Sequence, residues 1–262
     1  VQFFSFLLFQ FSYILYFSKQ GTMYFDIKDL VEFYSDTSLG KRTASSLSKT
    51  LNHLFKSGKG EMILGYGFTT PLLEPYLERF EKAVSLMPGL QGAINWPKSS
   101  NNVSVLVDEA FWPVETESVD TVLILHGLEN SLNPNVLLSE AWRVLKPNGT
   151  LLVFVSNRAG FWARTDITPF GCGRPYSFNQ ISNLLKQTNF AIEKNLLTLN
   201  GFPTENNMAL SLPNVMTYLL NLTKVEIFSG VIAVKASKKI FAPEKLVTDY
   251  LSLGVRKLSS SR

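Results

Sequence analysis

Short apolar runs alternate with longer amphipathic segments along most of the chain. Five runs rich in Val, Ile and Leu occur at 62–64, 83–87, 103–107, 121–125 and 151–155. Runs of this length and composition are typical of strands that are buried on both faces of a sheet. The intervening segments can hold crossover helices, so the pattern predicts βαβ units and a parallel sheet. Two further runs, 191–199 and 229–236, predict two more strands with a helix near 214–222 between them.

Helical periodicity is clearest in two places. Over 29–55 the apolar residues recur at turn spacing, and Gly40 predicts a break between two helices. Between the fourth and fifth runs, Asn133 is placed to cap a helix and Pro134 suits its first position. The apolar face of that helix is predicted to consist of Val136, Leu137, Ala141 and Leu145.

The two ends of the chain differ from the patterned middle. Residues 1–22 hold six phenylalanines and no charge before Lys19. This span is at the short end of what a bilayer requires, and it lacks the basic start and the cleavage site of a signal peptide. We interpret Met23 as the biological start and 1–22 as translated upstream sequence, with a membrane-anchoring helix as the alternative. We expect one domain over 23–240 and a basic, loosely ordered tail over 241–262.

Composition narrows the function classes. The chain has 262 residues, of which 45% are hydrophobic, and this suffices for one sizeable core. The formal charge of +4 is spread along the chain, so nucleic-acid binding is not indicated. One cysteine and two histidines exclude an intrachain disulfide, a thiol cluster and a histidine-rich metal site. We expect no metal and a cytoplasmic location.

The segment 118–158 carries a long ordered motif. Asp120 opens the fourth strand, a His-x-Leu-Glu run starts at His126, and a Glu-x-x-Arg-Val-Leu-Lys-Pro-x-Gly run starts at Glu140. In these motifs the chain resembles the class I S-adenosylmethionine-dependent methyltransferases, most closely their small-molecule branch. The resemblance implies a three-layer, Rossmann-like α/β fold with a mostly parallel seven-stranded sheet and helices on both faces. Residues 157–180 are similar to a bacterial subgroup whose glycine loop is also irregular.

The glycine loop after the first strand departs from the family pattern. In "ILGYGFTTP" (63–71) the third glycine of the family is replaced by Thr69, and its acidic residue by Ile63. At the end of the second strand the ribose-binding acid is replaced by Met87. Gly65 and Gly67 would let a ligand approach the backbone, although two glycines that merely make a turn are the alternative. The resemblance implies a cofactor site formed by Gly65, Tyr66, Gly67, Thr69, Asp108, Glu109 and His126.

No catalytic residue is assigned. Methyl transfer depends mainly on alignment, and a base is needed only if the acceptor must lose a proton. His126 is the one candidate with a near-neutral pKa, but a packed or cofactor-lining histidine is the favoured interpretation. Glu129 is either an acid at the start of the next helix, which is favoured, or a site carboxylate. Asp120, at the start of its strand, is interpreted as structural.

The loop after the fifth strand predicts a lid. It combines Gly160, Gly171 and Gly173 with aromatic, basic and acidic residues that could close on an anionic or aromatic acceptor. The alternative is a solvated loop with Arg–Asp pairs. Cys172 is interpreted as a free loop thiol. The candidate substrate-binding residues are Arg158, Trp162, Arg164, Asp166, Arg174 and Tyr176.

The sequence therefore predicts a methyltransferase that uses S-adenosylmethionine and acts on an unidentified acceptor, expected to be a small molecule. The alternative is a non-catalytic methyltransferase-like protein that has lost cofactor affinity. A short-chain dehydrogenase is excluded because the only Tyr-x-x-x-Lys pair, Tyr24 and Lys28, precedes the glycine loop. A membrane partner is expected only if residues 1–22 are expressed.

Overall fold

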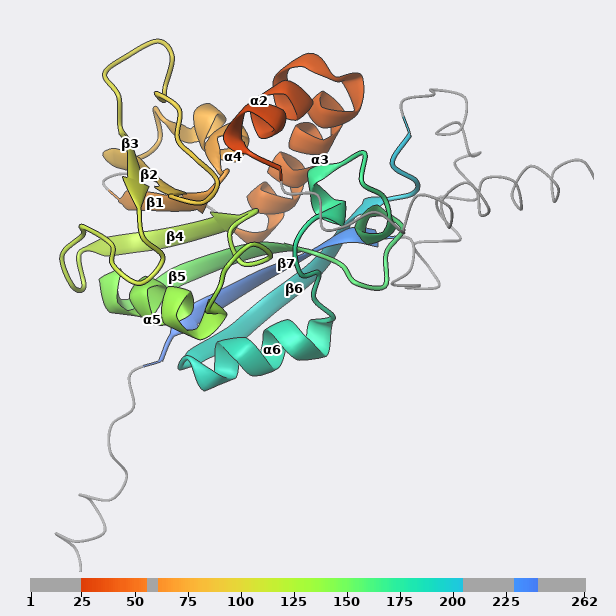
Figure 1. Cartoon of the computed structure of the whole chain (residues 1–262). Coiled ribbons are helices and arrows are strands. Elements are labelled where there is room, and N and C mark those ends of the chain that lie inside the picture. The colour runs from red at the N-terminus through yellow and green to blue at the C-terminus, as the bar shows by residue number, and fades with distance from the viewer. Residues whose placement is uncertain (1–24, 56–60, 205–228, 240–262) are drawn as a thin grey trace, which may run out of the picture.

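The computed structural model describes residues 25–55, 61–204 and 229–239, which form one mixed seven-stranded sheet between two layers of helices (Figure 1). The strand order is β3-β2-β1-β4-β5-β7-β6. Strands β1 to β5 pair in parallel, and β7 runs antiparallel to both β5 and β6. The predicted mostly parallel Rossmann-like fold is confirmed. The strands are β1 (Met62–Gly67), β2 (Lys82–Pro88), β3 (Ser104–Val107), β4 (Val119–Leu125), β5 (Leu145–Ser156), β6 (Phe190–Asn200) and β7 (Ser229–Lys238).

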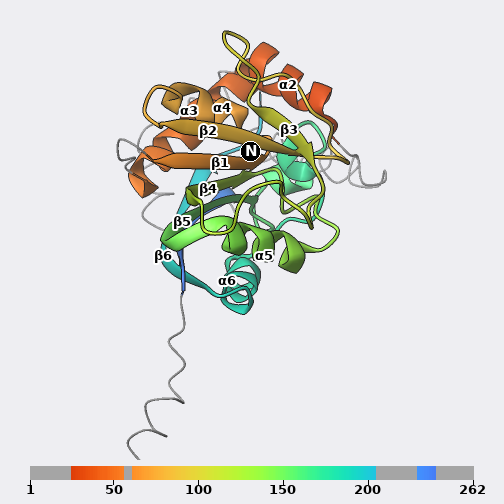
Figure 2. The same cartoon turned by 90° about the vertical axis from the view of Figure 1, so that its left-hand side faces the viewer.

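One face of the sheet is covered by the N-terminal helices α2 (Ile27–Asp36) and α3 (Ser38–Leu54), together with α4 (Thr70–Leu73) and the 3-10 turn η1 (Glu74–Tyr76) (Figure 2). The break between α2 and α3 falls at Thr37, which ends one helix and caps the next. The prediction that Gly40 marks this break is therefore wrong. Gly40 lies inside α3, where α2 crosses so closely that a Cβ would meet the carbonyl oxygen of Phe33 at 1.8 Å.

The opposite face is covered by α5 (Pro134–Val144) and α6 (Phe178–Gln187). Asn133 caps α5 by accepting a hydrogen bond from the Val136 N–H, and Pro134 takes the first position, as predicted. The buried face of α5 differs in part from the predicted one, because Val136 is only half-buried. Its buried residues are Leu137, Leu138, Ala141 and Val144.

All seven predicted strands are present, with two changes that bear on the site. Strand β1 continues through Tyr66 to Gly67, so both loop glycines belong to the strand itself. Strand β3 lies at the sheet edge, and Val105 and Leu106 on it are 42% and 56% exposed. The expectation that this strand is buried on both faces is therefore wrong.

Several expectations fall on segments outside the described residues: the helix near 214–222, the leader 1–22 with the start at Met23, and the tail 241–262. The single domain over 23–240 stays a prediction. Within the described ranges, no helix combines the length and the apolar character that crossing a membrane requires.

Candidate functional site

The candidate site lies at the carboxyl edge, by which we mean the edge of the sheet where strands β1 to β5 end. The strand order reverses between β1 and β4, and open parallel sheets bind ligands beyond such a reversal. At this point the Phe68 N–H, just after β1, donates to the carbonyl oxygen of Leu125 at the end of β4, over 2.9 Å. The two strands are thus joined at the place where the glycine turn begins.

The glycines of this turn are required by the packing of the chain itself. A Cβ on Gly65 would lie 2.0 Å from Thr69 Oγ1, and one on Gly67 would lie 2.2 Å from the Leu125 carbonyl oxygen. Gly67 also has φ 87°, a conformation that favours glycine. Protein atoms therefore occupy the space beside both glycines, and their role at a ligand stays a prediction. The Tyr66 side chain is buried and stacks on Trp112 in the core beside α5.

Aromatic side chains fill the space beyond β1 and β4, and we call this group the ring cluster. The Tyr34 hydroxyl of α2 and His126 Nε2 form a hydrogen bond of 2.8 Å. The His126 ring contacts the Phe170 ring with centroids 4.7 Å apart. The ring cluster consists of Tyr34, Phe68, His126, Trp162 and Phe170.

His126 follows β4 at the carboxyl edge, as the sequence predicts, but its environment excludes the role of a base. The side chain is buried at 2% exposure, and burial lowers the pKa of its imidazole to about 3. The ring is therefore neutral at physiological pH and has little affinity for a proton. Tyr34, the hydrogen-bond partner of His126, was not among the predicted site residues. It lies on the apolar face of a helix, and the sequence pattern of such a face does not indicate which side chain reaches a site.

The two carboxylates after β3 have different surroundings. Glu109 accepts hydrogen bonds from Ser131 Oγ (2.8 Å) and from the N–H groups of Leu132 (3.1 Å) and Asn133 (2.8 Å). It therefore stabilises the start of α5, which leaves it poorly suited to the adenine contact expected from the family. Asp108 is exposed, and its carboxylate accepts a hydrogen bond from the Ala110 N–H over 2.8 Å.

For Glu129 the sequence left two interpretations open, an acid at the start of the next helix and a site carboxylate. Its Oε1 accepts from the Ser156 N–H at the end of β5 over 2.7 Å, and its exposure is 3%. The favoured interpretation as an acid at the start of the next helix is wrong, because that position is taken by Glu109. Burial raises the pKa of the Glu129 carboxyl, although hydrogen bonds from Ser156 oppose the shift.

Nine buried side-chain polar atoms of the described residues lack a hydrogen-bond partner, and four of them belong to residues that follow strands at the carboxyl edge. Gln91, which follows β2, donates from Nε2 to the His126 carbonyl oxygen over 3.3 Å, and its Oε1 stays unpaired. Each such atom costs roughly 1–3 kcal/mol unless a water molecule or a ligand pairs with it. The four atoms are Thr69 Oγ1, Gln91 Oε1, Glu129 Oε2 and Thr168 Oγ1.

The segment after β5 is packed into the fold through its aromatic residues. The Trp162 indole N–H donates to the Gly201 carbonyl oxygen over 2.9 Å, and the Tyr176 hydroxyl donates to that of Leu128 over 3.2 Å. Its glycines lie against backbone, since a Cβ on Gly160 or Gly171 would meet a carbonyl oxygen at 2.2 or 1.8 Å. The expectation of glycine hinges is therefore corrected: these positions are glycine because the backbone approaches closely.

The charged residues of this segment are largely turned to solvent, and their role at an acceptor stays a prediction. Arg158, Arg164 and Arg174 are exposed, and Asp166 is half-buried. Cys172 is a free thiol, as predicted, but it is buried, and burial together with the charge of Asp166 raises its pKa to about 11. A thiol with so high a pKa is not a nucleophile at neutral pH.

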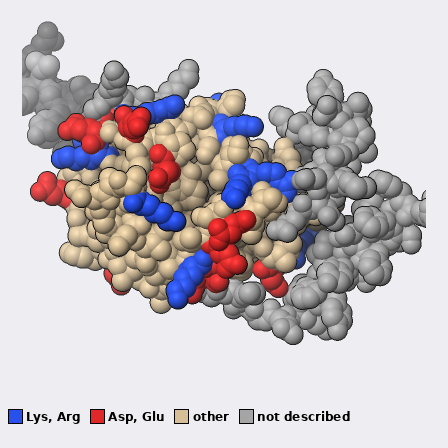
Figure 3. All heavy atoms as spheres, turned by 90° about the horizontal axis from the view of Figure 1, so that it is seen from above, with Lys and Arg blue, Asp and Glu red and all other residues tan. Residues whose placement is uncertain are grey.

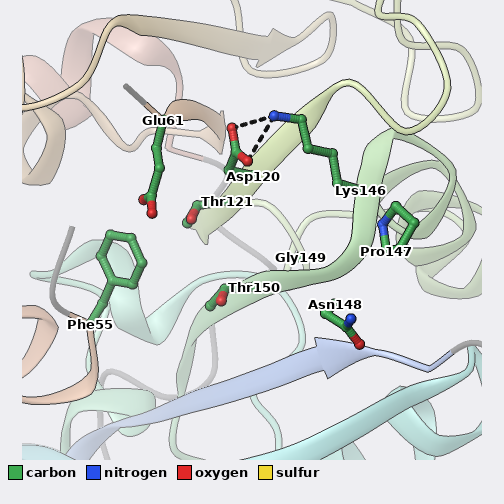
Figure 4. Close-up of a pocket in the computed structure, with 9 residues that line it drawn as sticks. All are labelled: Phe55, Glu61, Asp120, Thr121, Lys146, Pro147, Asn148, Gly149 and Thr150. Atoms are coloured by element: carbon green, nitrogen blue, oxygen red, sulfur yellow. Dashed lines mark hydrogen bonds and ion pairs between the residues drawn. The ribbon is translucent and has the colours of Figure 1, made fainter. Parts of the chain in front are cut away.

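A second feature lies at the opposite edge of the sheet, where the strands begin. A cavity of about 190 Å³ is lined by Glu61, Asp120, Lys146 and neighbouring residues (Figure 4). Asp120 pairs with Lys146 Nζ over 2.8 Å and accepts the Met62 N–H over 2.9 Å. Asp120 thus joins the starts of β1 and β4, and its predicted structural role is confirmed. This cavity is remote from the strand ends that form the candidate site.

Charges of both signs are mixed on one face of the molecule. Acidic and basic side chains lie next to one another on the face seen from above in Figure 3, where neither sign forms a continuous patch. Among the described residues, no three or more His, Cys, Asp and Glu side chains are arranged to hold a metal ion.

Comparison with known proteins identifies a domain and a fold. Residues 64–153, about a third of the chain, match the methyltransferase domain family. An S-adenosylmethionine-dependent methyltransferase from Archaeoglobus fulgidus is similar with a TM-score of 0.57 and 17% identity, over 81% of this chain and 100% of that chain. An S-adenosylmethionine-dependent methyltransferase and possible histamine N-methyltransferase from Thermotoga maritima has a TM-score of 0.55 and 16% identity, over 77% and 91%.

The [4+2]-cyclase SpnF has the same fold, with a TM-score of 0.55 and 16% identity over 79% of this chain and 84% of that chain. At these identities the likeness concerns the fold, and this neighbour indicates that the fold alone does not determine the reaction. No curated protein sequence matches the chain.

Proposed function

We propose that this chain, which resembles the class I S-adenosylmethionine-dependent methyltransferases in domain and fold, transfers the methyl group of S-adenosylmethionine to a small-molecule acceptor. The observation that carries this proposal is the place of the matched domain. Residues 64–153 begin in β1 and end in β5, so they include both strands between which the order reverses. The domain match supports S-adenosylmethionine as the cofactor and does not favour a non-catalytic role.

The residues at the carboxyl edge suit a ligand that joins an amino acid to a nucleoside. Thr69 Oγ1 and Gln91 Oε1 are unpaired buried atoms on the β1–β2 side, and Asp108 presents a carboxylate after β3. Carboxylate and amide oxygens accept hydrogen bonds from amino groups, of which the cofactor carries two. We propose that these side chains hold the cofactor together with the main chain of Gly65, Tyr66 and Gly67.

For methyl transfer, the protein mainly has to position the acceptor and provide a suitable environment for the reacting groups. S-adenosylmethionine, when bound, supplies a methyl group that is activated by a sulfonium. The chain aligns the acceptor, and alignment can account for most of the rate effect. The neutral His126 suits a neighbouring sulfonium better than an imidazolium would, because two like charges repel strongly in a buried site. The apolar rings of the ring cluster would exclude water from a ligand bound beside them.

We assign the acceptor side to the segment after β5. Trp162 and Tyr176 fix this segment through their hydrogen bonds to Gly201 and Leu128. The side chains of Arg158, Arg164 and Arg174 are exposed, so they give no support for an anionic acceptor inside the crevice. Asp166 remains a candidate only for a contact near the opening.

Calorimetric titration of the full chain with S-adenosylmethionine and S-adenosylhomocysteine tests the proposal. We expect binding in the micromolar range and a loss of about tenfold in Asp108→Asn, which keeps the Oδ1 acceptor but removes the charge. Glu78→Gln is the matched control. Glu78 is exposed and precedes the start of β2, at the edge of the sheet opposite the candidate site, so this substitution should leave the affinity unaltered. Absence of heat and of a thermal shift at millimolar cofactor would contradict the proposal and favour the non-catalytic alternative.

A further inference from the structure

Glu129 is a buried carboxyl with one oxygen fixed and the other unused. Oε1 accepts from the Ser156 N–H over 2.7 Å and from Ser156 Oγ over 3.2 Å, which orients the group against the end of β5. Oε2 is buried without a hydrogen-bond partner. Among the described residues, no lysine, arginine or histidine forms an ion pair with it. A buried carboxylate held in this way is costly unless a donor or a cation completes it.

We propose that Glu129 Oε2 binds an ammonium group of the methyl acceptor, which makes the acceptor a small amine; the proposal rests on the function proposed above. An ammonium group supplies both the hydrogen-bond donor and the charge that the carboxylate lacks. The same group would gain from nearby aromatic faces, because a ring face attracts a cation.

Two tyrosines locate the charge of Glu129 beside the ring cluster. Burial, and after it the charge of Glu129, raises the pKa of Tyr34 well above its ordinary value, and the same two causes raise the pKa of Tyr176 to about 12. Tyr34 belongs to the ring cluster and Tyr176 to the segment assigned to the acceptor. The charge of Glu129 therefore acts on both the ring cluster and the segment assigned to the acceptor.

The position of Glu129 favours the acceptor over the amino group of the cofactor. Its carbonyl oxygen accepts from the Arg174 N–H over 2.8 Å, so the residue is tied to the segment after β5. Thr168, the second residue with an unpaired buried oxygen on this side, belongs to the same segment. The unpaired atoms of Thr69 and Gln91 lie instead after β1 and β2, on the side assigned to the cofactor.

The test measures ligand preference in the full chain saturated with S-adenosylhomocysteine. The probes are three amine–carboxylate pairs on matched aromatic skeletons: benzylamine with benzoate, 2-phenylethylamine with phenylacetate, and 3-phenylpropylamine with 3-phenylpropionate. We expect the amines to bind at least about tenfold more tightly than their carboxylate partners. Glu129→Gln, which keeps the acceptor for the Ser156 N–H, should abolish this preference. Glu109→Gln removes an equal charge at the start of α5 and should retain it.

A second readout needs no variant. The ¹³C shift of the Glu129 carboxyl carbon should change when an amine binds, because Oε2 then gains a hydrogen-bonded cation. Absence of amine binding, an amine preference that survives in Glu129→Gln, or an unchanged ¹³C shift would overturn the proposal. So would a loss of more than about tenfold in S-adenosylhomocysteine affinity in Glu129→Gln, which would assign Glu129 to the cofactor's own ammonium group. If the wild-type chain does not bind S-adenosylhomocysteine, the proposed function itself fails.

Discussion

At the scale of single residues, the contact between Tyr34 and His126 determines how the candidate site responds to protons. The hydrogen bond of 2.8 Å joins the N-terminal layer to the end of β4, and both side chains are buried. Since burial lowers the pKa of His126 to about 3, the folded protein keeps this imidazole neutral far below its ordinary range. The unfolded chain has no such restriction and takes up a proton near pH 6.5.

This difference predicts a specific loss of stability in acid. Because only the unfolded chain binds the proton, the contribution of His126 is intact above pH 6.5 and is lost as the pH falls toward about 3. The loss at pH 5 amounts to about 2 kcal/mol. Denaturant unfolding at several pH values should show this slope in the wild type and in His53→Asn, and a shallower one in His126→Asn. Asparagine tolerates the left-handed backbone at position 126 (φ 53°).

His53 and His126 are the only two histidines of the chain, so this pair of variants removes each imidazole in turn. An equal slope in His126→Asn and in the wild type would contradict the assignment of the proton to the buried ring.

At the scale of elements, the crossing of α2 and α3 depends on the missing side chain of Gly40. A Cβ there would meet the Phe33 carbonyl oxygen at 1.8 Å, and backbone cannot move aside as a flexible side chain does. Alanine is intrinsically better than glycine inside a helix by about 1 kcal/mol. At position 40 the clash should exceed that gain.

We therefore expect Gly40→Ala to destabilise the fold by about 1–3 kcal/mol in denaturant unfolding, as overpacking does. Gly89→Ala is the matched control. Its Cβ would meet only the Val107 carbonyl oxygen at 3.8 Å, and the change should lie within about 0.5 kcal/mol of the wild type. Unaltered stability in Gly40→Ala would mean that α2 and α3 can separate at little cost.

Helices and strands were predictable where the local sequence signals agree. They were less predictable where contacts with other elements determine the structure. Helix α5 was predicted well because Asn133 and Pro134 specify its start locally. The exposure of β3 could not be predicted, because an apolar run is the same in an edge strand and in a central one. The break at Thr37 was missed because Gly40 is the stronger local signal, although its real reason is a contact between two helices.

At the scale of the whole molecule, two cores share one sheet. One core is covered by α2, α3 and α4, and the other by α5 and α6. Strands β4 and β5 each pair on both sides and contribute to both cores, whereas β3 pairs only with β2.

We expect native-state hydrogen exchange to follow this arrangement. The amides of β4 and β5 should be the slowest, since they open only with global unfolding, and those of β3 should be markedly faster. Mass spectrometry of peptides that cover 104–107, 119–125 and 151–156 would measure the difference. Protection of β3 equal to that of β4 would indicate that another chain covers this edge in solution.

For the candidate site, the sequence predicted where the strands end but not the contacts of the residues that follow them. Asp108 and Glu109 directly follow β3, and His126 directly follows β4, as the apolar runs indicate. The roles of Glu109 and Glu129 are set by contacts with segments more than twenty residues away, at Asn133 and Ser156. No local pattern encodes such contacts, and the same reason explains why Tyr34 and Gln91 were missed.

The burial of Cys172 has a practical consequence. Cys172 is the only cysteine of the chain, and it is 4% exposed. Its rate of chemical modification therefore reports how often the region around it opens. We expect a thiol-reactive dye to modify Cys172 only when local opening exposes it. A comparison of the labelling rate with and without S-adenosylhomocysteine would show whether the ligand reduces this opening. No engineered cysteine is needed, and no second thiol contributes to the signal.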